Sequence, residues 1–90
     1  MSVERTLTIR NQRGLHARAA AKFVKLAGQY DAEITVTKDG QAVDGGSIMG
    51  LMMLAAGIGT TIHVATRGVD AEAAIEGVEA LIEDKFGEEC

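Results

Sequence analysis

The chain has 90 residues, a net charge of −4 and 47% hydrophobic residues, which suits one small folded domain spanning residues 1–90 rather than a disordered segment. With one tyrosine, two phenylalanines and no tryptophan, the acidic chain lacks the cations and stacking aromatics of a nucleic-acid binder. No apolar run is long enough to cross a membrane, and the single cysteine, Cys90, cannot form an internal disulfide. We therefore expect a monomeric cytoplasmic protein.

The first third of the chain predicts a strand and a helix. Residues 3–10 alternate between apolar and polar side chains, which predicts a half-buried strand, and "NQRG" follows as a turn. Residues 17–27 predict a helix that ends at Gly28, a residue typical of the position after a helix. The apolar face expected for this helix contains Ala20, Val24 and Ala27.

The middle of the chain predicts a hairpin followed by a short helix. Residues 34–37 alternate, Asp39 and Gly40 both tolerate the positive φ of a tight turn, and residues 41–43 form the returning strand. Ser47 is expected to open a helix that runs to about Leu54.

A strand over residues 60–66 and a helix capped by Asp70 complete the chain. Apolar residues recur along this helix at the spacing of one helical face. They are Ala74, Ile75, Val78, Leu81, Ile82 and Phe86. The order βαββαβα predicts an α+β fold with all helices on one face of the sheet. The pattern favours a ferredoxin-like sandwich, although it does not specify the order of the strands.

His16 stands immediately before the first predicted helix, within "RGLHARAAAKFVKL". Ser, Thr, Asn and Asp are the efficient caps at such a position, so local stability does not explain a histidine there. The unpaired N–H groups of Ala17 and Arg18 attract anions, and the Arg18 side chain offers a fork of donors suited to phosphate. The positive helix end also disfavours a charged ring, which would keep the imidazole nucleophilic.

Two interpretations of His16 remain open from spacing alone: a transiently phosphorylated histidine or an ordinary surface residue. His63 lies within the strand over residues 60–66 and has neither a glycine nor an arginine beside it, so we expect a surface residue. Histidines in such different contexts, together with Cys90, do not predict a metal site.

The segment "GGSIMGLMMLAAG" places two apolar stripes on its predicted helix. One stripe contains Ile48, Leu51, Leu54 and Ala55, and the other contains Met49, Met52, Met53 and Ala56. A domain this small has little material to cover both, so the methionines form either an exposed docking patch or part of the core. Ser47 is first of all a helix cap, and a phosphate placed there would disturb partners rather than unfold the domain.

The segments "RGLHARAAAKFVKLA" and "SIMGLMMLAAGIGTTI", followed by an amphipathic C-terminal helix, resemble the histidine-containing phosphocarrier (HPr) family of the bacterial phosphoenolpyruvate-dependent phosphotransferase system. The resemblance extends over essentially the whole chain. It implies an HPr-like open-faced β-sandwich, with four antiparallel strands in the spatial order one, four, two, three covered on one face by three helices. This order differs from that of a ferredoxin-like fold.

The resemblance also implies a function. His16 would accept a phosphoryl group on Nδ1 from phosphorylated enzyme I and pass it to an EIIA-type protein, and Arg18 would steady the phosphate. Ser47 matches the serine that HPr kinase/phosphorylase modifies in species that have this enzyme. The matching docking surface contains Ile48, Met49, Met52 and, by extension of the stripe, Met53. Such a protein is a relay rather than an enzyme, and it needs no cofactor or metal.

Two positions differ from many family members: Ala19 replaces a proline, and Gly46 replaces a lysine before the serine. Without that lysine, Ser47 as a kinase target stays open. The "GLMMLAA" and "DKFGEE" segments resemble nitrogen-branch or α-proteobacterial relatives more than sugar-branch carriers. The alternative is a ferredoxin-like regulatory or protein-interaction module without a phosphohistidine.

Overall fold

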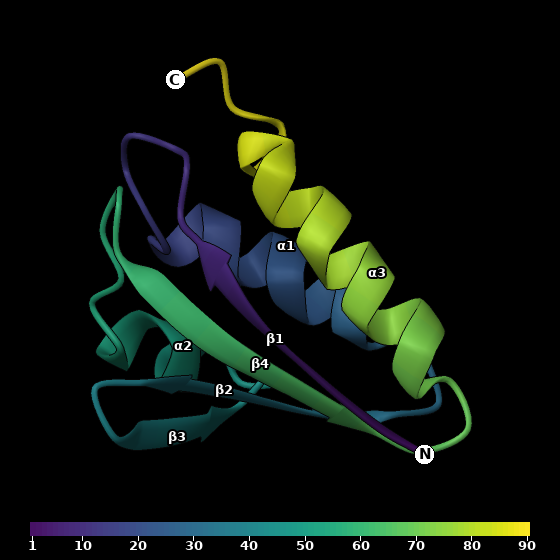
Figure 1. Cartoon of the computed structure of the whole chain (residues 1–90). Helices are drawn as coiled ribbons and strands as arrows, with labels where there is room; N and C mark the ends of the chain where they lie inside the picture. Colours follow the sequence, from purple (N-terminus) through teal and green to yellow (C-terminus); the bar gives the residue numbers. More distant parts are fainter.

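A computed structural model describes residues 1–90, and its strands form one antiparallel sheet with α1 and α3 on one face (Figure 1). The elements in chain order are β1 (Ser2–Thr8), α1 (Ala17–Ala27), β2 (Glu33–Lys38), β3 (Gln41–Asp44), α2 (Ile48–Met53), β4 (Thr61–Arg67), α3 (Ala71–Glu83) and a 3₁₀ turn η1 (Lys85–Gly87). The strand order β1-β4-β2-β3 is the one that the HPr resemblance implies. The ferredoxin-like arrangement favoured by the pattern alone is therefore wrong.

The hydrophobic core lies between the sheet and the helices. Alternate residues of the strands point into it, as the period-two pattern predicts. The sheet contributes Leu7, Ile34, Val36, Ile62 and Val64, and the helices contribute Phe23, Leu51, Ile75, Val78 and Ile82. Burial of each large aliphatic side chain stabilises the fold by roughly 1.5–3 kcal/mol, which makes this layer the main source of stability.

Helix α1 has the predicted bounds, although its buried face is rotated from the predicted one. Ala20 is fully buried, but Val24 and Ala27 are only half-buried, and the face centres on Ala19, Ala20 and Phe23. Gly28 ends the helix with φ −68°, so the left-handed conformation typical of a glycine after a helix is not used here.

The predicted turn between β2 and β3 is confirmed. Asp39 and Gly40 have φ of 51° and 81°, and they join Lys38 to Gln41 as the last pair of the ladder. Positive φ at both central residues is the requirement of a type I′ hairpin turn, whose twist matches that of the strands.

The expected stripes of the second helix are partly wrong. Leu51 and Leu54 are buried, but Ile48 and Ala55 are exposed and Ala56 is buried. The helix ends at Met53, and Ala55 adopts φ 52°, so the chain beyond Met53 no longer follows the helical period. The exposure of Ala55 and the burial of Ala56 therefore follow from the loop rather than from the helix.

The ends of the last helix also differ from expectation. Asp70 precedes α3, but its carboxylate makes no cap bond and instead accepts the N–H of Asp31 at 2.7 Å. Phe86 is fully buried, yet it lies beyond α3 in η1 with φ 55°. The left-handed turn reverses the chain so that the Phe86 ring enters the core and the C-terminal tail, residues 84–90, runs back toward the start of α1.

Two glycines with positive φ provide a test of the loop before α1. Gly14 has φ 65°, and an added Cβ would lie 2.4 Å from the Ala56 oxygen, whereas Gly40 has φ 81° and open space around it. We expect Gly40→Ala to cost about 1 kcal/mol of unfolding free energy and Gly14→Ala about 3 kcal/mol, because only the latter forces two backbone segments apart. Urea denaturation followed by circular dichroism measures both; equal costs would contradict the close approach.

Candidate functional site

His16 occupies the cap position at the start of α1, as the sequence predicts. Its φ and ψ are −76° and −179°, and its side chain makes no cap hydrogen bond. The first helical bond runs from the Ala20 N–H to the His16 oxygen at 2.8 Å. The N–H groups of Ala17, Arg18 and Ala19 have no acceptor within the protein. The helix therefore presents free donors and the positive end of its dipole beside the imidazole.

The loop before His16 is held by tertiary hydrogen bonds. The Leu15 N–H donates to the Ala56 oxygen at 2.9 Å, which ties the loop to the segment after α2. The Gly14 N–H donates to the backbone oxygen of Asn11 at 3.1 Å, and the Asn11 side-chain Nδ2 donates to the backbone oxygen of Gly14 at 2.8 Å. These bonds hold His16 in place although the residue contributes no cap of its own.

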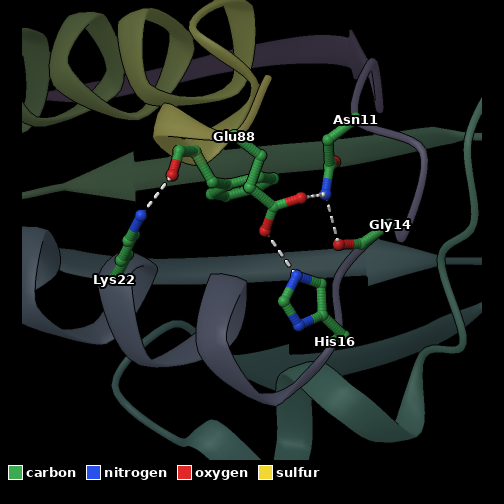
Figure 2. A network of polar contacts seen from close by, with 6 residues as sticks. Asn11, Gly14, His16, Lys22 and Glu88 are labelled. Carbon is green, nitrogen blue, oxygen red and sulfur yellow. Dashed lines mark hydrogen bonds and ion pairs between the residues drawn. The ribbon is translucent and has the colours of Figure 1, made fainter. Parts of the chain in front are cut away.

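The imidazole of His16 contacts the C-terminal tail (Figure 2). Its Nε2 lies 2.5 Å from Glu88 Oε2, and both side chains are 17% exposed. The other carboxylate oxygen, Oε1, accepts from Asn11 Nδ2 at 3.0 Å. An ionised carboxylate only accepts hydrogen bonds, so this contact assigns the proton to Nε2. Nδ1 has no partner in the protein and points away from Glu88 in Figure 2.

The contact between Glu88 and its neighbours changes the pKa of the Glu88 carboxyl. The pKa of Glu88 lies below its ordinary value, chiefly because Asn11 donates a hydrogen bond to the ionised form. Burial opposes this change, whereas the hydrogen bond from His16 and the charges of His16 and Arg13 lower the pKa further. Glu88 is therefore an anion at neutral pH, placed against the histidine ring.

Arg18 is exposed and forms no ion pair, so its guanidinium is free to bind an anion. It lines a hollow of about 440 Å³ together with Arg13 and Lys22. Residues 87–90 of the tail also line this hollow. The surface next to the start of α1 thus carries three cations in a protein whose net charge is negative.

An apolar patch, defined as Ile48, Met49, Met52 and Met53, lies on α2. These side chains are 40%, 70%, 40% and 65% exposed, so the interpretation as core residues is wrong. Met52 also lines a hollow of about 310 Å³ that contains His16, Arg13 and Leu15. The patch is therefore continuous with the histidine, and a partner that contacts one can contact the other.

Ser47 caps α2 as predicted: its Oγ accepts the Gly50 N–H at 3.0 Å. The residue is half-buried and precedes Ile48 of the apolar patch directly. Gly46, at the position where many family members carry lysine, donates its N–H to Asp44. Ser47 therefore lies at the edge of the apolar patch.

The remaining candidates lie elsewhere. His63 is half-exposed on the open face of the sheet, where its Nε2 contacts Glu4 at 2.8 Å, and this surface placement is the predicted one. Cys90 is exposed, and no group of three potential ligands that could hold a metal ion is present. None of the helices combines the length and the hydropathy that a membrane span requires.

Glu88 and Asn11 are site residues that the sequence interpretation missed. Glu88 lies 72 residues from His16, and Asn11 lies 77 residues from Glu88. No periodicity or local spacing connects these positions, since the contact depends on the reversal of the chain at Phe86. Only the acidic character of the "GEE" segment, set against the cations near His16, hinted at it.

Comparison with known proteins identifies the family and agrees with the fold. The chain matches the family described as "PTS HPr component phosphorylation site" over residues 3–84. It is 48% identical over 86 residues to the phosphocarrier protein HPr of Cupriavidus necator, covering 96% of this chain and 97% of the relative. It is 45% identical to the phosphocarrier protein NPr of Shewanella violacea, covering 96% and 94% of the two chains.

A solved structure of HPr from Thermoanaerobacter tengcongensis superposes on this chain with a TM-score of 0.93. The two share 44% sequence identity, and the alignment covers 98% of this chain and 99% of the other. The chain therefore belongs to the HPr family of phosphocarrier proteins of the phosphotransferase system.

The lowered pKa of Glu88 predicts a pH-dependent contribution to stability. At a pH above 4.5, the ordinary pKa of a glutamate, the ionised Glu88 carboxylate stabilises the folded protein. This stabilisation is lost as the pH falls through the lowered pKa of Glu88 in the folded state. We expect Glu88→Gln to be less stable than the parent protein near pH ~7 and by a smaller margin near pH ~3. Urea unfolding at the two pH values measures this; a difference independent of pH would contradict it.

Proposed function

We propose that this protein carries a phosphoryl group on Nδ1 of His16, which it receives from phosphorylated enzyme I and passes to an EIIA-type protein in the cytoplasm. The observation that supports this most is the geometry of the imidazole. Its Nε2 is engaged by Glu88, its Nδ1 is free, and the adjoining helix start has three N–H groups without acceptors. Family membership supports the same role.

The transfer that we propose balances without a cofactor. The lone pair of Nδ1 forms a bond to phosphorus while the bond between phosphorus and the donor breaks, and the donor keeps that electron pair. The ring retains the proton on Nε2 and gains a positive charge. In the second transfer the acceptor attacks phosphorus and the N–P bond breaks, which returns the neutral ring.

The free donors at the start of α1 would bind the phosphoryl oxygens. The N–H groups of Ala17 and Arg18 are fixed in direction by the helix and need no reorganisation when charge arrives. The helix dipole adds about 0.3–1 kcal/mol for an anion at this position. The unpaired guanidinium of Arg18 supplies two more parallel donors, so its role in the proposal is to steady the phosphate.

The apolar patch is the surface on which we expect enzyme I and the acceptor to dock. Exposed methionines adapt to different partners because their side chains are unbranched and polarisable. The patch borders the hollow at His16, so a partner bound there would have its own reacting group close to Nδ1. One surface thus serves the donor and the acceptor in turn.

Ser47 is the position at which we propose that HPr kinase/phosphorylase, where the cell has it, regulates docking. A phosphate adds a charge of about −1.5 to −2 beside Ile48, and an apolar interface does not tolerate a desolvated charge. The helix start itself accepts an anion, so the fold would persist. The relatives include both HPr and NPr proteins, and either the sugar or the nitrogen branch is compatible with this surface.

The phosphorylation site has a direct test. We expect His16→Ala to abolish labelling by phosphoenolpyruvate and enzyme I, because no other side chain combines a free ring nitrogen with unpaired helix donors. His63→Ala is the matched control and should label like the parent protein, since that ring is bound to Glu4 on the open sheet face. Mass spectrometry at alkaline pH, before and after acidification, detects the acid-labile group. Acid-labile phosphate on His16→Ala would exclude His16.

The effect of a negative charge at position 47 on docking is tested by two substitutions that both preserve the helix cap. Ser47→Asp and Ser47→Asn both cap a helix about as well as serine, so each should change the unfolding free energy by less than ~1 kcal/mol. Only the aspartate adds a charge, and we expect it to weaken binding of enzyme I by about tenfold. Isothermal titration calorimetry measures the two affinities. If both variants bind alike, charge at this position does not regulate docking.

A further inference from the structure

The strongest arrangement outside the helix start is the bridge that Glu88 makes between Asn11 and His16. We propose that Glu88, anchored by Asn11, is a positioning residue for His16: it selects the ring nitrogen that stays free and stabilises the charge that the ring gains on phosphorylation. The proposal rests on the function proposed above for His16. It assigns a role to the C-terminal tail that the sequence interpretation does not contain.

The two oxygens of the Glu88 carboxylate have different donors (Figure 2). Oε1 accepts from Asn11 Nδ2 at 3.0 Å, and Oε2 accepts from His16 Nε2 at 2.5 Å. The carboxylate and the ring are both largely withdrawn from water, since each is only 17% exposed. A carboxylate is the one side-chain group that offers two such acceptors at this spacing.

Asn11 is a buried anchor whose orientation follows from its neighbours. The residue has no exposed surface, and its Nδ2 donates both to Glu88 and to the Gly14 oxygen. Its Oδ1 is buried without a hydrogen-bond partner, which carries a cost in free energy. A flipped amide would set an oxygen against two acceptors, so the side chain keeps its two donors inward at the expense of Oδ1.

The tail is fastened on both sides of Glu88. Before it, the Phe86 ring is fully buried and its backbone oxygen accepts from Lys22 Nζ at 2.6 Å. After it, the Cys90 oxygen accepts from the Gln12 N–H at 2.9 Å. The Glu88 carboxylate is thus held against the ring by the backbone on either side, as a positioning group requires.

The chemical consequence concerns the tautomer and the charge of the ring. A hydrogen bond from Nε2 to the carboxylate favours the tautomer in which Nδ1 keeps its lone pair for attack on phosphorus. When the N–P bond forms, the donor's bond to phosphorus breaks and the ring becomes a cation with its proton still on Nε2. Glu88 then neutralises this cation, and the charged ring remains a good leaving group for the second transfer.

Other charges around the carboxylate do not replace it. Arg13 from the loop, Arg18 and Lys22 from α1 and Glu89 from the tail line the hollow next to Glu88. Of the three cations, Arg13 lowers the pKa of the Glu88 carboxyl, but none of them can accept a hydrogen bond from the ring. Glu88 is the one acid with a hydrogen bond to His16, so its removal leaves the phosphorylated ring facing cations.

The test compares Glu88→Gln with Glu89→Gln. An amide has a single acceptor oxygen, so Glu88→Gln cannot satisfy both donors, whereas Glu89→Gln removes a neighbouring charge that makes no contact with the ring. The ring ¹⁵N chemical shifts of His16 in the free, unphosphorylated protein give the ratio of tautomers, and His63 is an internal reference. We expect about a tenfold rise in the Nδ1–H form for Glu88→Gln and no change for Glu89→Gln.

A second measurement connects the tautomer to transfer. The rate of phosphorylation by enzyme I at limiting carrier concentration should fall about tenfold in Glu88→Gln, with the Kd for enzyme I unchanged. An unchanged tautomer ratio, or a changed ratio with an unchanged rate, would overturn the proposal. A parent protein that is never phosphorylated would instead contradict the proposed function, and the tautomer ratio is independent of that result.

Discussion

The start of helix α1 is the constraint on which the site depends. Three N–H groups point out of the helix without acceptors, and the residue at the cap position is a histidine that does not bind them. An efficient cap would contribute roughly 1 kcal/mol to stability but would occupy one of these donors. The fold gives up this local stabilisation and leaves the donors open to an anion, a conflict between local preference and structure that is typical of functional sites.

Tertiary contacts replace the missing cap. The Leu15 N–H binds the Ala56 oxygen, and Asn11 holds the Gly14 carbonyl, so the loop is fixed from two directions. Glycine at position 14 is essential to this arrangement, because its positive φ and the absence of a Cβ let the loop approach the Ala56 backbone. Because the loop is fixed, the backbone of His16, which follows it directly, is fixed as well.

Three segments that are far apart in the chain meet at this point. The sheet order β1-β4-β2-β3 carries the end of β1, the segment after α2 and the tail after α3 to one end of the sandwich. The α2 segment brings an apolar surface, and the tail brings the Glu88 carboxylate. In the function that we propose, docking, phosphate binding and control of the ring therefore fall to different segments of the chain.

Much of the local structure follows from the sequence because short-range rules govern it. The bounds of α1, the Asp39–Gly40 turn, the Ser47 cap and the position of His16 at a helix start depend on neighbours within a few residues. The strand order did not follow from the pattern, which favoured a different fold, and only the family resemblance supplied it.

The contacts that complete the site could not be predicted in this way. Three features depend on how distant segments pack: the chain reversal at Phe86, the hydrogen bond from the Asp31 N–H to the Asp70 carboxylate, and the exposure of Ile48. Glu88 meets His16 across 72 residues, because a left-handed turn and a buried aromatic ring direct the tail back along the molecule. Periodicity in the sequence predicts which face of a helix or strand is buried, but it does not predict which distant segment packs against that face. The environment of the imidazole depends on this packing, so only the tertiary structure decides it.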